Sequence, residues 1–99
     1  MTYPFNPVRG GNQIVNTSGT SQSISLPESS QSVRVVNNGS LYAAHIRIGN
    51  STQTATTADT IILPGESLIL RKGQEEDTLA YIQVDDSTEL HVQPGEGGV

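Results

Sequence analysis

Two histidines, a group of carboxylates and many hydroxyls are the residues of this chain that could do chemistry. His45 and His91 are its two imidazoles, and either could be the base that a serine nucleophile needs within hydrogen-bond reach. Both alternate with apolar neighbours, so we expect both to point outward as solvated surface groups. No Gly-x-Ser-x-Gly turn, which would expose a nucleophile, accompanies them. We therefore expect a protein that is not an enzyme.

Carboxylates are concentrated in the last third of the chain. Asp85 and Asp86 are adjacent, the run 75–77 is acidic, and Glu89 follows shortly after. A calcium site needs several more oxygen ligands at an ordered spacing, so plain turn residues are the favoured interpretation and a weak divalent site is the alternative. The chain has no cysteine, which excludes disulfides, thiolate metal sites and thiol nucleophiles. We expect no metal and no cofactor.

The composition describes one small domain with an uncharged polar surface. Of 99 residues, 34 are Ser, Thr, Asn or Gln, and the net charge is −5. Residues 1–72 contain five basic and three acidic groups, whereas residues 73–99 contain seven acidic groups and no basic one. A nucleic-acid-binding protein would need a basic face, so this class is excluded. The acidic end is a solvated face or, alternatively, a surface that meets a basic partner.

Neither a membrane span nor a signal peptide is expected. The longest apolar run is Ile61–Leu63, far shorter than the roughly 20 residues that a membrane-spanning helix needs. No charged segment followed by an apolar stretch begins the chain.

Alternating polarity predicts strands that must position these groups. In the segment 41–48, Ala44, Ile46 and Ile48 share one face with Tyr42, and His45 lies on the other. The segment 32–36 alternates in the same way, and the Asn-Gly pair within 37–40 predicts a hairpin between the two.

A second hairpin is predicted between segments 80–84 and 89–93, with a turn at 85–88. Its first strand would place Ala80, Ile82 and Val84 inward and Tyr81 outward. Packing of Tyr81 under a loop is the favoured interpretation, and an exposed tyrosine that serves a binding surface is the alternative. Its second strand would place Leu90 and Val92 inward.

Four shorter segments complete the predicted strands: 13–16, 21–26, 60–63 and 67–72. Pro64 and Gly65 between the last two indicate a type II turn. Seven or eight short strands with regular turn signals predict an all-β fold, a small antiparallel β-sandwich that is Ig-like or jelly-roll-like. We expect an extended N-terminal arm over residues 1–12, the sandwich over 13–93 and a flexible C-terminal tail over 94–99.

Two non-strand segments are candidates for contact with a partner. The arm alternates prolines with apolar groups, and proline lowers the entropy that an extended segment loses when it docks. An arm folded back on its own sandwich is the alternative. The polar loop 49–59 is unusually long for so small a domain. The candidate interface residues are Tyr3, Pro4, Phe5, Pro7, Val8, Thr52, Thr54 and Thr56.

The segments 33–39, 44–49 and 62–67, the last leading into 80–82, resemble small tailed-phage virion proteins. The resemblance covers roughly residues 30–97, and the family includes head decoration, or cement, proteins and head-fibre bases. It implies a structural protein that binds the major capsid protein on the outer surface of a phage head, as a homo-oligomer with a trimer favoured. The expected location is the virion, after synthesis in the host cytoplasm. A fibre, neck or baseplate module, or a sandwich that recognises a receptor or glycan, is the alternative.

Overall fold

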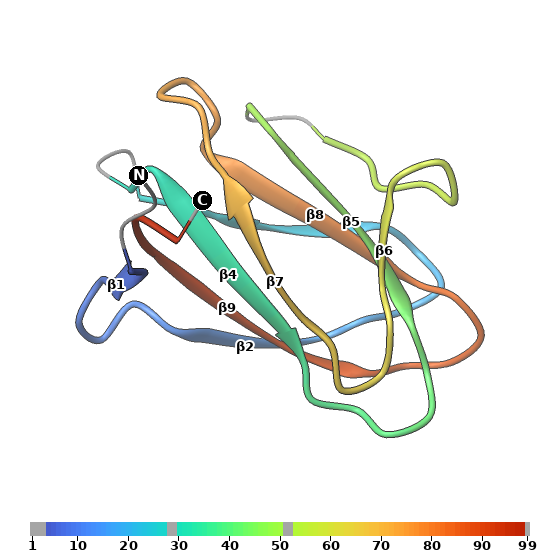
Figure 1. Cartoon of the computed structure of the whole chain (residues 1–99). Helices are drawn as coiled ribbons and strands as arrows, with labels where there is room; N and C mark the ends of the chain where they lie inside the picture. Colours follow the sequence, from blue (N-terminus) through green and yellow to red (C-terminus); the bar gives the residue numbers. More distant parts are fainter. Residues whose placement is uncertain (1–3, 28–29, 51–52, 99) are drawn as a thin grey trace.

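The computed structural model describes residues 4–27, 30–50 and 53–98. Within these residues the chain forms nine short β-strands and two antiparallel sheets (Figure 1). No helix that could cross a membrane is present in this part of the chain. The strands are β1 (Asn6–Pro7), β2 (Gln13–Asn16), β3 (Gln22–Ser25), β4 (Ser32–Asn37), β5 (Ala44–Gly49), β6 (Thr60–Ile62), β7 (Ser67–Arg71), β8 (Thr78–Gln83) and β9 (Glu89–Glu96).

The order of the strands is that of a jelly roll. The four-stranded sheet runs β3-β8-β5-β6, and in the five-stranded sheet β1 and β2 both pair with β9, followed by β4 and β7. The paired strands β2 and β9 therefore continue across the sandwich as β3 and β8, and β4 and β7 continue as β5 and β6. This wrapping distinguishes the jelly roll from the Ig-like arrangement that the sequence left open.

Both predicted hairpins are wrong, because each predicted turn crosses from one sheet to the other. β4 pairs with β7 and β9, whereas β5 pairs with β6 and β8. The link 84–88 likewise joins β8 in one sheet to β9 in the other. Gly39 does not have the positive φ of a tight hairpin turn, and a Cβ there would overlap Thr88 Oγ1. The glycine at this position serves close packing between links.

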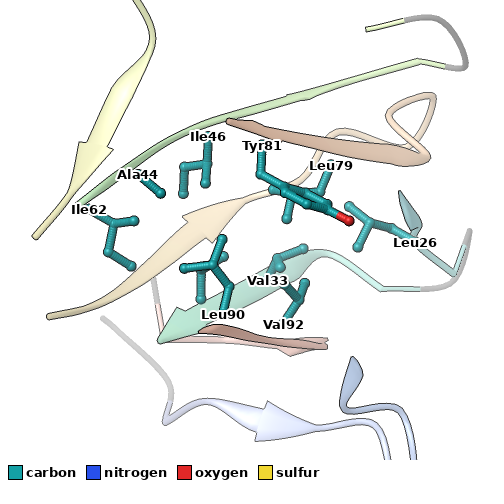
Figure 2. Close-up of a cluster of buried hydrophobic side chains, with 10 residues drawn as sticks. Leu26, Val33, Ala44, Ile46, Ile62, Leu79, Tyr81, Leu90 and Val92 are labelled. Carbon is teal, nitrogen blue, oxygen red and sulfur yellow. The ribbon is translucent and has the colours of Figure 1, made fainter. Parts of the chain in front are cut away.

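The core lies between the sheets and is filled by aliphatic side chains (Figure 2). Val33 and Val35 of β4, and Leu90 and Val92 of β9, point inward, as their alternation predicts. They face Ala44, Ile46, Ile62, Leu79 and Tyr81 of the other sheet, with Leu26 at one end.

The predicted faces of β8 are reversed. Figure 2 shows the ring of Tyr81 in the core beside Leu26, and this residue is 5% exposed. Val84, by contrast, is 42% exposed. The alternation misleads here because Ala80, on the outer face, is also buried. A strand that is covered on both sides does not show a polar face in its sequence.

Four links meet at one end of the sandwich, which we call the tip: 17–21, 38–43, 63–66 and 84–88. The fully buried Asn37 holds three of them together. Its Nδ2 donates to the carbonyl oxygens of Tyr42 and Ile62, at 2.9 and 3.3 Å, and its Oδ1 accepts from Thr88 Oγ1 at 2.7 Å. In the fourth link, Thr17 Oγ1 accepts a hydrogen bond from the Thr88 amide, and the Thr17 amide donates one to the Thr88 carbonyl oxygen. The tip is therefore a hydrogen-bonded unit.

Candidate functional site

The N-terminal segment lies on the five-stranded sheet. Asn6 and Pro7 of β1 pair with Glu96 and Gly95 of β9, and the amide of Val8 donates to the Pro94 carbonyl at 2.8 Å. Because β9 continues to Glu96, the sheet includes residues 94–96, which the sequence assigned to the tail.

Phe5 packs on the outer face of this sheet. A Cβ added at Gly95 would lie 2.7 Å from its ring, and one added at Gly98 would lie 3.0 Å from both Phe5 and Ile69. Of the candidate interface residues here, Phe5 and Val8 are half-buried, Pro4 and Pro7 are exposed, and Tyr3 lies outside the described residues.

The long loop lies over the opposite outer face, that of the four-stranded sheet. Residues 53–59 of this loop are called the strap below. The amide of Ala55 donates to Ser21 Oγ at 2.8 Å, next to β3, although the strap leads into β6 at the other edge of this sheet. Thr54 and Thr56 are exposed on the strap, whereas Thr52 lies outside the described residues. The candidate residues of the N-terminal segment and of the loop are therefore on opposite sides of the molecule.

Asp59 fixes the end of the strap. Its carboxylate accepts from Arg47 Nε at 2.8 Å and from the Thr56 amide at 2.7 Å. Burial by itself would raise the pKa of Asp59, but the bonds from Thr56 and Arg47 and the charge of Arg47 together lower it below its ordinary value. The carbonyl oxygen of Asp59 lies 3.0 Å from His45 Nδ1.

The expectation that His45 is a solvated surface group is wrong, because the strap covers its imidazole. The imidazole points away from the core, as the alternation predicts, but it is 9% exposed and bonded to the strap. His91 lies on the outer face of the five-stranded sheet, where Asn12 Nδ2 is 3.3 Å from its Nδ1. Because the two imidazoles are on opposite outer faces, they do not belong to one site.

The acidic segment 73–99 does not form one patch. The residues 75–77 lie in the link between β7 and β8, at the end opposite the tip, whereas Asp85 and Asp86 lie at the tip. The length of β8 separates the two groups. Within the described ranges, no three His, Asp or Glu side chains come together in a way that could hold a metal ion.

An exposed apolar surface lies beside the tip, and sequence reasoning missed it. Ile61 and Ile82 flank His45 on the outer face of the four-stranded sheet. The same register places Leu63 and Val84 on either side of Ala43, whose carbonyl accepts from the Val84 amide at 3.2 Å. We call these five apolar residues the apolar patch: Ala43, Ile61, Leu63, Ile82 and Val84.

A polar hollow lies on the other outer face, over β4 and β9, and has a volume of about 470 Å³. Asn12, Arg34, Val36, Asn38, His91 and Gln93 line it. A second hollow, of about 550 Å³, lies beside β1 and is lined in part by Ser32 and Arg71. Ser32 Oγ is the one buried side-chain oxygen without a hydrogen-bond partner in the described part of the chain.

No protein-family model and no curated protein matches this chain. Among solved structures it is similar to a de novo designed double-stranded β-helix (TM-score 0.54, 15% identity, 84% of this chain and 96% of that one). It is also similar to PirA (TM-score 0.55, 10% identity, 88% and 95%). A third is hydroxypropylphosphonic acid epoxidase from S. wedmorenis in complex with fosfomycin (TM-score 0.54, 11% identity, 84% of this chain and 42% of that one). At these identities the likeness shows the fold alone, so the function is argued from the surface.

Proposed function

We propose that this chain is a non-enzymatic structural protein of a tailed phage, a decoration protein that binds the outer surface of the head and stabilises it. Two lines of reasoning support the proposal. The segments within residues 30–97 resemble small virion proteins, and the rigid sandwich carries an exposed apolar surface. The apolar patch is the observation on which the docking argument depends.

The patch has the properties of a protein-binding surface. Leu63 is 50% exposed, Ile61 43% and Val84 42%, and Leu41 on the neighbouring link is 75% exposed. Contiguous exposed apolar side chains on a soluble domain mark interaction surfaces more often than scattered single ones do. Since the tip is held by the bonds of Asn37 and Thr88, little entropy is lost when it docks.

The charges around the patch indicate the chemistry of the partner. The four links of the tip contain Glu66, Asp85 and Asp86 and no lysine or arginine. A complementary capsid surface would have an apolar centre flanked by basic side chains. Thr54 and Thr56 lie on the same outer face as the patch and can add polar contacts at its rim. Many copies on one head would strengthen weak individual contacts through multivalency.

The N-terminal segment has a different role in this proposal. Phe5 and Val8 are occupied with the chain's own β9, on the face opposite the patch. We therefore assign docking on the capsid to the patch, and the arm to closing the edge of the five-stranded sheet. The proposed homo-trimer is tested by light scattering on the purified protein.

Co-sedimentation tests the proposal directly. Heads of the phage that encodes this chain, made without it, are mixed with the purified protein at micromolar concentration. The double variant Leu63→Ser/Val84→Ser should bind at least about tenfold more weakly, because roughly 1.5 kcal/mol or more is lost for each buried aliphatic side chain. Ile14→Ser is the matched control, since Ile14 is 58% exposed on the opposite face.

Two outcomes would overturn the proposal. Wild-type protein that stays in the supernatant would contradict attachment to the head, and electron cryo-microscopy of whole particles would then place the chain on the fibre, neck or baseplate if it is a virion protein. Equal binding by the double variant and by Ile14→Ser would contradict the patch as the docking surface. Replacing His91 by glutamine should leave binding intact, because His91 lies on the outer face opposite the patch.

A further inference from the structure

The polar hollow on the five-stranded sheet is built from adjacent cross-strand pairs. Val36 of β4 pairs with His91 of β9, and Arg34 pairs with Gln93 one step further along the face. These four side chains point away from the core, because they alternate along the two strands with buried residues. The buried residues are Val33, Val35, Leu90 and Val92. The floor of the hollow is therefore a rigid part of the sheet.

Arg34 is the formally charged group of this floor, and no ion pair among the described residues neutralises it. Neither of the ion pairs within the described residues, Arg47–Asp59 and His91–Glu89, involves Arg34. At this position the Arg34 guanidinium can present its donor fork to a carboxylate from a ligand.

The groups around Arg34 combine polar donors and acceptors with an apolar surface. Asn12, Asn38 and Gln93 contribute amides, and Val36 contributes methyl groups between them. Asn12 Nδ2 lies 3.3 Å from His91 Nδ1, and Asn38 Nδ2 donates to Glu89 Oε2 at 2.9 Å. These contacts hold the Asn12 and Asn38 side chains at the rim of the hollow. Glu89 Oε2 lies 3.7 Å from His91 Nε2, so this carboxylate faces the imidazole at the Asn38 end.

We propose that this hollow binds an acidic saccharide, a sugar ring that carries a carboxylate. Arg34 would bind the carboxylate, the amides of Asn12 and Gln93 would bind ring hydroxyls, and Val36 would pack against the C–H face of the ring. A small inorganic anion would use Arg34 and make no bond to the amides. A neutral sugar would leave the guanidinium without a counterion. The volume of about 470 Å³ is in the range of small-molecule sites.

The inference is independent of the proposed attachment to a phage head. The hollow is on the five-stranded sheet and the apolar patch is on the four-stranded sheet, so one surface can dock while the other stays open. A protein bound to a head through the patch would present the hollow on its far side. Failure of either proposal leaves the other standing.

Binding of methyl β-glucuronide to the full chain tests the site. Titration followed by ¹H–¹⁵N NMR should shift the amide signals of Arg34, Val36, His91 and Gln93. Methyl β-glucoside and acetate test the ring and the carboxylate separately, and each should bind at least tenfold more weakly than the glucuronide.

Variants of the floor test the same site. Arg34→Gln should weaken glucuronide binding at least tenfold, and Gln93→Ala is a second variant on the same floor. Arg9→Gln, an exposed arginine in the β1–β2 link, is the matched control.

Each result decides for or against the site. Loss of binding in Arg34→Gln and Gln93→Ala, with Arg9→Gln unchanged, supports it. Equal affinity for acetate and the glucuronide would reduce the hollow to a simple anion site and overturn the proposal. So would no shift with the glucuronide at millimolar concentration, or wild-type affinity in Arg34→Gln.

Discussion

Individual polar residues decide how the long loop lies on this protein. Asp59 bonds the Thr56 amide and Arg47 through its carboxylate, and its carbonyl oxygen lies beside the His45 ring. Its side chain is 13% exposed and that of Arg47 is 39% exposed, so water screens part of the interaction. These contacts hold the end of the strap against the four-stranded sheet.

Replacement of Asp59 by asparagine should make the protein less stable near neutral pH. The folded state lowers the pKa of Asp59 below the value of about 4 that this residue has in the unfolded chain. The carboxylate therefore stabilises the fold fully above the unfolded pKa, and this stabilisation is lost as the pH falls through the folded pKa. Asp59→Asn should cost about 1–2 kcal/mol at pH 7, the usual range for hydrogen bonds to a charged group that is partly screened. The difference from wild type should shrink below pH 4.

Urea unfolding at pH 7 and at pH 3 measures this difference. Asp85→Asn, an exposed aspartate at the tip, is the control and should change the unfolding free energy by less than about 0.5 kcal/mol at either pH. A deficit in Asp59→Asn that is as large at pH 3 as at pH 7 would contradict the linkage.

At the scale of elements, β9 organises the five-stranded sheet. It pairs with β4 along one edge and with both β1 and β2 along the other. The approach of β1 is close at Gly95, where an added Cβ would lie 2.5 Å from the Asn6 carbonyl oxygen. A glycine is required here because backbone and the Phe5 ring occupy the space.

Gly95→Ala should therefore release the N-terminal segment while the core stays folded. Overpacking of this kind costs about 1–3 kcal/mol, so residues 4–8 should open about tenfold more often or more. Hydrogen exchange at the Val8 amide, and chymotrypsin cleavage after Phe5, measure the opening. Gly19→Ala is the matched control, because its new Cβ would lie 3.7 Å from Gln83 Nε2, an ordinary contact. Protection of residues 4–8 from exchange and cleavage should not change in this variant. Equal protection in the two variants would contradict the close approach.

For the whole molecule, the connectivity predicts that the two sheets unfold as one cooperative unit. Every link between β2 and β9, except the one from β5 to β6, passes from one sheet to the other. Neither sheet therefore consists of consecutive strands that could fold first and alone. Asn37 connects the links 38–43, 63–66 and 84–88 at one end of this arrangement, the second of them through backbone bonds with Gly65 and Glu66.

Asn37→Ala should destabilise both sheets together. The substitution leaves the Tyr42 and Ile62 carbonyls and the Thr88 hydroxyl without their buried partner, at a total cost of about 2–4 kcal/mol. Urea transitions followed by far-ultraviolet circular dichroism and by tyrosine fluorescence should coincide at the same lowered midpoint. Asn38→Ala, the exposed neighbour, should stay within about 0.5 kcal/mol of wild type. Separate transitions for the two probes would contradict the single unit.

The sequence by itself determined the class of fold, most of the strands and several of their faces. Alternation placed Val33, Val35, Leu90 and Val92 inward, and Pro64-Gly65 predicted a turn in which Gly65 has φ +75° and the Glu66 amide bonds the Leu63 carbonyl. These features depend on neighbouring residues, since a strand's period of two and a turn's φ are local properties.

Only the tertiary structure decided which strands pair, which outer faces are covered and where the binding surfaces lie. A short link with turn residues is compatible both with a hairpin and with a crossing between sheets, because the hydrogen bonds that distinguish them join distant residues. The burial of His45 by the strap and the inward position of Tyr81 follow from that pairing. So do the apolar patch and the polar hollow, since each combines residues from strands far apart in the sequence.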